Sequence, residues 1–578
     1  MTRKLGKNNT SIVDMELSMN DKSKENPQAK DATFGTLLGN FINIYWKTLV
    51  VVIWPLILMP LVILNNEQKY RCLFVVALMS VYWVTEVIPL PITGLLPIVL
   101  YPLLGVMDTE DTCKCYMNDT TMMFVGSLVI ALAIEHSGLH MRVAFVIIKF
   151  IGCGHRKLSL GLFLVTMFIS MWISNTAATA MMLPIVETVL MELEAQGLGK
   201  MFVQDEDEDE DSESPKRPTK LTMGYYLAIA YASSIGGIGT LVGTGTNLTL
   251  KGIYESTFPK SPGINFAAWM VYAVPVMIIM GLLTWLWLQV MYMGLFRPSS
   301  REAKAIDIGD EGEKIAASVI EAKHKELGPV TWHESCIGIL FVTILMLWFF
   351  RKPDFINGWP KFITTKDVKD STAAVGLIIL MFVLPSRLDF LSAFSSDPNK
   401  RPKKRSPGLM CWKLIMKKMH WGLIFVLGGG FAIATGSRLS QLSDTLGHAL
   451  VFLQKMNFLA ILAVVCLFAE TVTELTSNVA VANIILPVLA DMAKAIKIHP
   501  LYLMVPAALG CSFSFHLPVG TPPNAIVSAA AKIKTKDFVI AGIGPSLITA
   551  VVVPLSFATW GVYAFNLDDL PMEMMDFN

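Results

Sequence analysis

Charged residues are scarce in this chain of 578 residues, of which Asp, Glu, Lys and Arg make up 16%. Soluble domains usually contain roughly 25%. The net charge of +1 leaves no basic surface of the kind that nucleic acids require, so nucleic-acid partners are excluded. The eight cysteines are scattered singly, except for Cys113 and Cys115, and none has a partner at metal-ligand spacing. Most of them should therefore be small apolar core residues.

Catalytic motifs are missing as well. The chain has no His-Glu-x-x-His zinc motif, no Gly-x-Ser-x-Gly nucleophile elbow and no pair of intramembrane aspartates. Glu135, His136 and Glu474 are ionisable groups at or near membrane depth, where such groups are functional candidates. No reaction centre surrounds them, so the sequence predicts a protein that is not an enzyme and holds no cofactor. We expect Glu474 to be a hydrogen-bonded structural group.

The first 40 residues lack an apolar core and are rich in lysine, so no cleavable signal peptide is expected. Long uncharged runs follow, at 49–64, 71–84, 266–290 and 540–558. A helix that crosses the bilayer needs about 20 apolar residues. By this measure the chain has about 11 transmembrane helices plus two interrupted hairpins. The sequence predicts an all-α polytopic protein embedded in the lipid bilayer.

Two short polar sequences interrupt apolar stretches at matching places, 174–176 (Ser-Asn-Thr) and 477–479 (Ser-Asn-Val). In both, a Leu-Pro pair begins nine residues after the serine. A small hydroxyl residue, Ser170 or Thr473, lies four residues before the serine of each tip. The match indicates an internal repeat.

The apolar arms around each polar tip are short, and they span 158–173 with 177–193 and 458–473 with 479–490. Re-entrant hairpins with their tips near the membrane midplane explain this length. Ser and Asn are strong helix N-caps, so the second arm should begin at the tip with free N–H groups that favour an anion. Carbonyls at the end of the first arm and side-chain oxygens of the tip offer hard ligands for a small cation.

A breaker run interrupts a later apolar span in each half, at 243–247 (Gly-Thr-Gly-Thr-Asn) and 520–524 (Gly-Thr-Pro-Pro-Asn). A broken helix frees backbone groups that are tolerated at membrane depth only inside protein or beside a polar cavity. Interrupted segments at corresponding places in two halves are the best sequence indication of a transporter's binding site. The sequence therefore predicts a secondary transporter built from an inverted repeat.

Lysine and arginine gather in the N-terminal tail 1–44 and in three loops, at 196–221, at 297–332 and around 401–405. This placement indicates that these segments are cytosolic. The C-terminal tail 566–578 has acidic residues but no Lys or Arg, which favours the extracellular side. The same topology places Asn118, in the triplet Asn-Asp-Thr, outside the cell as a glycosylation candidate.

Residues 511–527 (Cys-Ser-Phe-Ser-Phe-His-Leu-Pro-Val-Gly-Thr-Pro-Pro-Asn-Ala-Ile-Val) resemble the signature of the divalent anion/sodium symporter family. Residues 83–91 (Trp-Val-Thr-Glu-Val-Ile-Pro-Leu-Pro) and 427–432 (Leu-Gly-Gly-Gly-Phe-Ala) are similar to segments of its animal di- and tricarboxylate branch, which includes the INDY transporters. The likeness extends from about residue 45 to residue 565.

The resemblance implies a plasma-membrane homodimer in which each protomer has a fixed scaffold domain and a mobile transport domain that works as an elevator. Its cargo would be succinate, citrate and similar acids, co-transported with sodium. The expected parts are a cytosolic tail (1–44), first-repeat scaffold helices (45–157), first-repeat transport helices (158–296, with an acidic cytosolic loop at 197–221), a cytosolic loop (297–332), second-repeat scaffold helices (333–450, with a basic cytosolic loop at 398–418), second-repeat transport helices (451–565) and an extracellular tail (566–578). The acidic run 204–214 should be a solvated linker.

The family's binding residues can be placed on matching positions of this chain. A first sodium would be held by Ser170, Ser174, Asn175 and Gly243, and a second by Thr473, Thr476, Asn478 and Gly520. The substrate carboxylates would meet Asn175, Thr176, Thr244, Gly245, Asn478, Val479, Thr521 and Pro522.

Two positions depart from the family's pattern. Thr246 occupies a place where the family usually has proline, and Val479 occupies one where it has threonine, although animal relatives also carry valine there. No Arg or Lys lies within either motif, so anion capture would rely on helix dipoles and co-bound cations, which favours sodium coupling. Three alternatives stay open: a sodium-independent dicarboxylate or citrate exchanger, which the Thr246 change keeps open, a carrier of sulfate or another divalent oxyanion, and a non-transporting membrane receptor or scaffold. The presence of both Ser-Asn tips argues against the last.

Overall fold

The computed structural model describes residues 34–152, 154–203, 217–352, 357–394, 397, 399, 401–442, 457–567 and 571. The regular elements among these residues are helices, apart from a short antiparallel ribbon of β1 (Phe202–Val203) and β2 (Arg217–Pro218). Eight of their helices are long and apolar enough to cross a membrane. The prediction of a helical membrane protein is confirmed, whereas the count of 11 spans stays a prediction. The acidic run 204–214 lies outside the described residues.

The chain divides within α2 (Phe34–Leu64), and the unit that begins at Pro55 holds the remaining elements. Its first half comprises α3 (Gln68–Thr85), α4 (Leu90–Gly94), α5 (Leu96–Leu103), α6 (Thr109–Tyr116), α7 (Asp119–Ser137), α8 (Leu139–Ile151), α9 (His155–Ser170), α10 (Asn175–Ala195), α11 (Lys220–Gly236), η1 (Gly237–Gly239), α12 (Gly245–Thr257), α13 (Phe266–Tyr292), α14 (Arg301–Ala305) and α15 (Gly309–Glu326). Its second half comprises α16 (Trp332–Phe349), η2 (Trp359–Phe362), α17 (Asp370–Val383), η3 (Asp389–Phe394), α18 (Trp412–Lys418), α19 (Gly422–Leu439), α21 (Phe458–Thr473), α22 (Asn478–Ala495), α23 (Leu501–Gly510), α24 (Pro522–Ala531), α25 (Thr535–Ser556), η6 (Phe557–Gly561) and α26 (Val562–Phe565).

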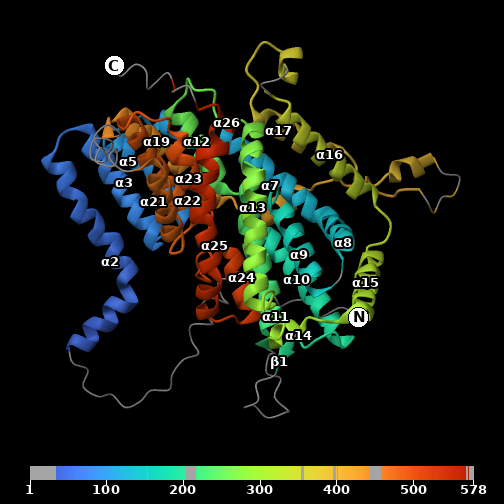
Figure 1. Ribbon diagram of the computed structural model, residues 1–578. Coiled ribbons are helices and arrows are strands. Elements are labelled where there is room, and N and C mark those ends of the chain that lie inside the picture. Colours follow the sequence, from blue (N-terminus) through green and yellow to red (C-terminus); the bar gives the residue numbers. More distant parts are fainter. Residues whose placement is uncertain are drawn as a thin grey trace, which may run out of the picture. The chain divides into compact units, whose positions relative to one another are not determined.

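A helical hairpin is present at each predicted place, and both are packed in the same way. Their second arms, α10 and α22, are longer than expected and long enough to cross a membrane, so the re-entrant course stays a prediction. In the first half α9 and α10 lie against α11, and in the second half α21 and α22 lie against α23. Figure 1 shows α21, α22, α23 and α25 side by side in orange and red. The two halves meet where α12 contacts α22 and α11 contacts α24. This meeting brings both polar tips into one region of the fold.

Helix α19 is packed closely through three consecutive glycines. A Cβ atom on Gly428 would lie 2.2 Å from the Tyr116 ring, and one on Gly429 would lie 2.6 Å from the carbonyl oxygen of Gly94. One on Gly430 would lie 1.9 Å from Oδ1 of Asn483 on α22. These close approaches explain why the Leu-Gly-Gly-Gly-Phe-Ala segment needs residues without side chains.

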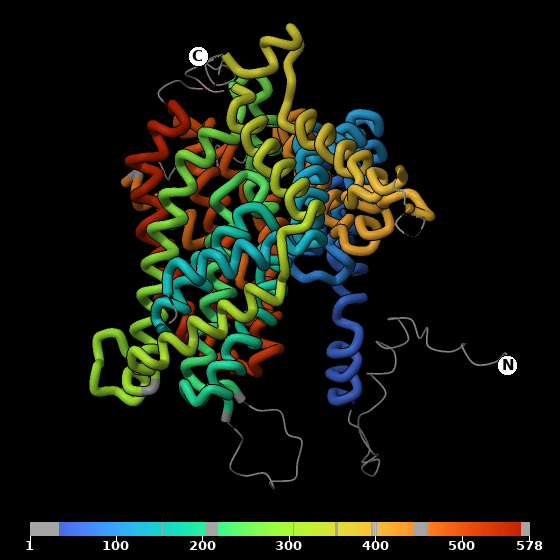
Figure 2. The backbone as a smooth tube through the Cα atoms, turned by 90° about the vertical axis from the view of Figure 1, so that its right-hand side faces the viewer, coloured from blue at the N-terminus to red at the C-terminus, as the bar shows by residue number. Residues whose placement is uncertain are grey.

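The segment 297–332, expected as a cytosolic loop, contains an ordered helix, α15. Its buried residues Ala316, Val319 and Ile320 form an apolar stripe at helical spacing, and α15 packs against α8. A 90° turn of the view shows α16 and α17, in yellow, beside α7 in cyan (Figure 2), in agreement with their contacts.

Candidate functional site

Both hairpin tips begin a helix, as their Ser-Asn sequences predict. Helix α10 begins at Asn175, and the hydroxyl of Ser174 caps it by accepting a hydrogen bond from the N–H of Ala177 at 3.3 Å. Helix α22 begins at Asn478 after Ser477, whose side chain makes no capping bond. The first N–H groups of both helices therefore lie at the tips.

Both breaker runs interrupt a helix at the predicted place. In the first half α11 ends at Gly236 and α12 begins at Gly245; in the second half α23 ends at Gly510 and α24 begins at Pro522. The asparagine that closes each run, Asn247 or Asn524, donates from Nδ2 to two carbonyls that lie ten and seven residues before it, at 2.7–3.2 Å. These bonds brace both loops identically.

Three oxygens gather behind each tip and share one hydroxyl proton. In the first hairpin Ser170 Oγ lies 3.0 Å from Asn175 Oδ1 and 2.6 Å from the carbonyl oxygen of Ser233. In the second, Thr473 Oγ1 lies 2.9 Å from Asn478 Oδ1 and 3.0 Å from the carbonyl oxygen of Cys511. A hydroxyl has one hydrogen to donate, so each group keeps several free lone pairs. We call these two groups the oxygen triads.

The first breaker run touches the second half of the molecule directly. A Cβ atom on Gly245 would lie 2.6 Å from the side chain of Val479 at the second tip. The hydroxyl of Thr246 lies 2.5 Å from the hydroxyl of Ser512, in the loop after α23. The residue that stands in place of the family's usual proline thus joins the two repeats.

The polar tips are partly open, whereas the groups behind them are closed. Ser174, Asn175, Thr176, Thr244, Gly245, Ser477 and Asn478 are half-buried, and Pro522 is exposed. Ser170, Thr473 and Asn247 are fully buried. The helices α10, α12, α22 and α24 all begin in this region, so their positive ends favour an anion that reaches the tips. These groups can therefore hold a buried cation behind the tips and an accessible anion in front of them.

Three of the proposed ligands have specific surroundings. The hydroxyl of Thr476 donates to the carbonyl of Trp83 on α3 at 2.9 Å, so it faces away from the second triad. A Cβ on Gly243 would lie 2.4 Å from the Gly237 carbonyl oxygen, and one on Gly520 would lie 1.9 Å from the Ser514 hydroxyl. Both glycines are therefore required for close packing of the breaker runs.

Glu474 is a structural acceptor, as predicted. Its two carboxylate oxygens accept hydrogen bonds from the Ser514 hydroxyl at 2.6 Å and from three consecutive backbone N–H groups, those of Phe515, His516 and Leu517, at 2.6–3.1 Å. These donors stabilise the ionised form and fix the loop before the second breaker run.

A buried ion-pair network lies on α12, beyond the first breaker run. Lys251 is 2% exposed, and its Nζ lies 2.5 Å from Glu255 Oε1 and 3.9 Å from Asp370 Oδ2 at the start of α17. Asp370 in turn binds Arg351 at 2.5 Å. Because Lys251 is engaged here, it offers no charge to the tips. The network links a helix of the expected transport part to a helix of the expected scaffold.

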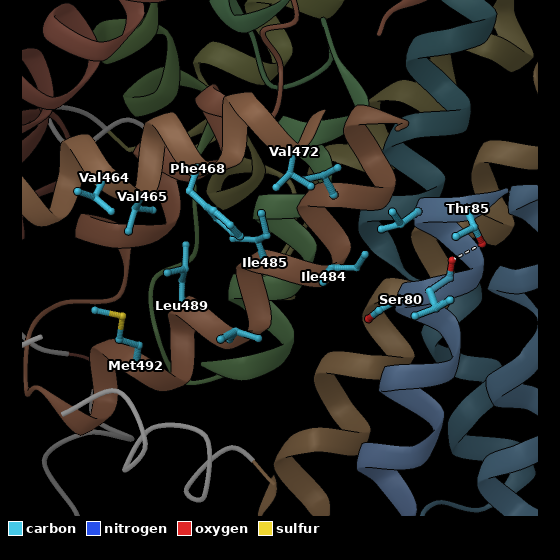
Figure 3. A pocket seen from close by; sticks show the side chains of 14 residues that line it. Ser80, Thr85, Val464, Val465, Phe468, Val472, Ile484, Ile485, Leu489 and Met492 are labelled. Carbon is cyan, nitrogen blue, oxygen red and sulfur yellow. Dashed lines mark hydrogen bonds between the residues drawn. The ribbon is translucent and has the colours of Figure 1, made fainter. Parts of the chain in front are cut away.

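An apolar cavity of about 500 Å³ lies between α3, α21 and α22. Figure 3 shows the side chains that line it, including Phe468, Val472 and Ile485. Its two hydroxyl residues, Ser80 and Thr85, donate to carbonyls of their own helix at 2.7 and 2.6 Å. The lining therefore offers no donor to a carboxylate, and this cavity is separate from the oxygen triads.

Asn118 caps α7 and is half-buried. Its Oδ1 accepts from the N–H of Thr121 at 2.9 Å, and its Nδ2, the atom that a glycan would modify, donates to the Cys115 carbonyl at 3.0 Å. Glycosylation of Asn118 stays a prediction.

Sequence reasoning missed several polar groups of this region: Ser233, Asn247, Ser512 and Asn524. Asn247 and Asn524 were placed in the breaker runs, but no role was predicted for their side chains. The available signal was the repeat itself, since Asn247 and Asn524 close matched runs. Ser233 contributes a backbone carbonyl, for which no side-chain pattern exists.

Two helical hairpins with polar tips and two broken helices around one polar region define a secondary transporter of the membrane. Residues 42–567 match the family model described as the sodium:sulfate symporter transmembrane region, and the chain belongs to this family. It is therefore a multi-pass membrane transporter and not an enzyme. The resemblance drawn from residues 511–527 is confirmed.

Known relatives are similar over nearly their whole length. The protein I'm not dead yet of Drosophila melanogaster is 45% identical, with 92% of each chain covered. The Na(+)/citrate cotransporter of Rattus norvegicus is 39% identical, with 94% of this chain and 98% of the relative covered. Solute carrier family 13 member 2 of Homo sapiens is 38% identical, with 91% of this chain and 94% of the relative covered.

Proposed function

We propose that this chain is a sodium-coupled carrier of di- and tricarboxylates, such as succinate and citrate, in the plasma membrane. The family of sodium:sulfate symporters and the names of the relatives support a sodium-driven carrier of small dianions and trianions. The observation that carries the proposal is the pair of oxygen triads, each directly behind a helix N-terminus. Each triad offers lone pairs to a cation, and each helix start offers N–H groups to a carboxylate.

The proposed sites combine the tips with the breaker runs. The first sodium would lie among Ser170, Ser174, Asn175 and Gly243. The second would lie among Thr473, Thr476, Asn478 and Gly520, with Thr476 contributing its backbone because its hydroxyl is bonded to the Trp83 carbonyl. The carboxylates would contact Asn175, Thr176, Thr244, Gly245, Asn478, Val479, Thr521 and Pro522. Bound sodium would supply the positive charge that the motifs lack, since Lys251 is paired elsewhere.

The net charge that crosses the membrane favours coupling of the anion to sodium. Moving one charge across the membrane is worth about 2.3 kcal/mol per 100 mV, so a dianion alone would enter a negative cell against the potential. Three or more sodium ions per dianion reverse the sign of the net charge and drive accumulation. An exchanger of one dianion for another would carry no net charge and gain nothing from the potential.

We further propose an elevator mechanism in a homodimer, with the N-terminus in the cytosol and the C-terminus outside. The hairpins and broken helices would move together as the transport part, while α3, α7, α16, α17 and α19 would stay in the scaffold. The apolar cavity beside α3 supports this division, because an apolar contact surface has few directional bonds to break. The Thr476–Trp83 bond and the Lys251–Asp370 pair would break during movement.

The test is uptake of labelled citrate and succinate into cells that express the chain, with sodium or choline outside. We expect uptake that collapses in choline. Uptake that persists in choline and accelerates after preloading with dicarboxylate would identify an exchanger instead. Uptake of labelled sulfate that excess succinate cannot displace would identify a sulfate carrier, and no uptake despite surface expression would contradict transport of these anions.

The site assignment has a separate test. Asn175→Ala and Asn478→Ala should abolish uptake while the protein still reaches the surface, because each variant removes an oxygen from a triad. Asn357→Ala, at an exposed position, serves as the control and should transport normally. Normal uptake by both tip variants would contradict the assignment.

A further inference from the structure

A second glutamate, Glu470, lies one helical turn before Glu474 on α21 and is not part of the sites proposed above. Its side chain is 3% exposed. Neither of its carboxyl oxygens has a hydrogen-bond partner within the described part of the chain. An ionised carboxylate is costly to bury without partners, and Glu474 already places one negative charge nearby. Glu470 therefore needs a positively charged ligand to neutralise it.

The surroundings of Glu470 suit a proton rather than a metal ion. The hydroxyl of Ser546 on α25 is close enough to interact with it, though outside normal hydrogen-bond geometry. Hard metal cations require several oxygen ligands, whereas a proton requires one oxygen lone pair. The part of α25 that faces it, residues 540–556, carries no titratable side chain.

The other titratable groups on the packed elements are few. Helix α21 itself carries Cys466 and Glu474, and α23 with the loop after it contributes Tyr502, Cys511 and His516; Asp491 and Lys494 lie near the far end of α22. None of these offers Glu470 a hydrogen bond that would stabilise its charge.

A route for protons connects this carboxyl to a more open part of the molecule. The side chain of His516 is 29% exposed. Its Nδ1 lies 3.2 Å from Glu474 Oε1 and 3.4 Å from the hydroxyl of Ser546, which lies beside Glu470. Imidazole and hydroxyl groups both donate and accept protons. The series His516–Ser546–Glu470 can therefore pass a proton inward and outward once the Ser546 side chain turns to bond Glu470.

The internal repeat shows that the fold does not need a carboxyl here. Glu470 lies three residues before Thr473, and the residue three before Ser170 is Met167. Met167 is also 3% exposed, on the corresponding helix of the first hairpin. An apolar side chain is thus accommodated at the matching place, so the carboxyl of Glu470 serves a purpose other than packing.

We propose that Glu470 is the proton-binding site of the second hairpin, loaded through His516 and Ser546, and that its proton crosses the membrane with the substrate. The proton adds to one carboxylate oxygen on one side and returns to water on the other, and no other bond changes. The proposal rests on the proposed function, since it requires that the chain transports a carboxylate.

The test uses the full-length purified protein in liposomes that contain a pH-sensitive dye. Labelled succinate is added in a mildly alkaline medium, in which both of its carboxyls are ionised and it carries no proton itself. The wild type should acidify the lumen as succinate enters. Glu470→Gln, which imitates the protonated form, and Glu470→Met, which copies the first hairpin, should exchange succinate but lose the acidification. Glu470→Asp should retain it.

The outcomes separate the two proposals. Absence of carboxylate transport by the wild type would overturn the proposed function. Succinate transport without acidification by the wild type would overturn only the proton site. The site would also be overturned if Glu470→Gln or Glu470→Met acidified like the wild type, or if both variants folded but failed to exchange succinate.

Discussion

The second oxygen triad makes a quantitative prediction about sodium dependence. Valine has the shape of threonine, so Thr473→Val removes only the hydroxyl that lies 2.9 Å from Asn478 Oδ1 and 3.0 Å from the Cys511 carbonyl. A polar contact to a charged group contributes about 1.5–3 kcal/mol, and about 1.4 kcal/mol changes an affinity tenfold. We therefore expect the sodium concentration for half-maximal succinate uptake to rise by roughly 10- to 150-fold.

The assay is initial succinate uptake across a sodium titration, corrected for the amount of protein at the surface. The matched control is Thr471→Val on the same helix, because the Thr471 hydroxyl donates at 2.7 Å to the Leu467 carbonyl of its own helix and is exposed. Its sodium dependence should equal that of the wild type. An unchanged half-saturation in Thr473→Val, or an equal shift in both variants, would refute the second triad as a sodium site.

Three further predictions follow from the same region. Gly243→Ala should abolish uptake, because its Cβ would lie 2.4 and 2.8 Å from two backbone carbonyl oxygens. Gly376→Ala, whose Cβ would have nothing within 4 Å, is the control and should transport normally. Equal uptake by both variants would contradict the packing argument. Asp370→Asn should destabilise the folded protein by about 3–5 kcal/mol, because Arg351 loses its buried carboxylate partner while Lys251 keeps Glu255. Its melting temperature in detergent should therefore fall, and an unchanged value would show that the network is dispensable. Thr476→Val should shift the sodium half-saturation far less than Thr473→Val, because its hydroxyl faces α3; an equal shift would show that this hydroxyl turns into the site during transport.

Local signals carried most of the fold prediction. Ser174 and Ser477 precede helices because capping depends on residues that are neighbours in sequence. The breaks at 243–247 and 520–524 were predictable because glycine and proline disrupt helices in any surroundings. The repeat then indicated that both tips belong to one site, and the contact between Gly245 and Val479 agrees with that reading.

Contacts between distant segments could not be predicted in the same way. Thr246 and Ser512 are 266 residues apart, and nothing in either local sequence indicates that their hydroxyls meet. The pairing of Lys251 with Asp370 depends on how α12 packs beside α17. Glu470 was overlooked because its sequence does not reveal that it is buried without a partner. In each case the missing information was tertiary packing.

The asparagine braces have a consequence for how such a protein can change over generations. Each breaker loop is held by the amide of its last residue, through carbonyls at the same two offsets in both halves. The residues between the brace and the start of the loop, Thr-Gly-Thr in one half and Thr-Pro-Pro in the other, differ without loss of the break. The conformation of the loop thus depends on the asparagine, whereas the groups that face the anion are other residues. Mutation can therefore alter which anion is bound while the broken helix is kept.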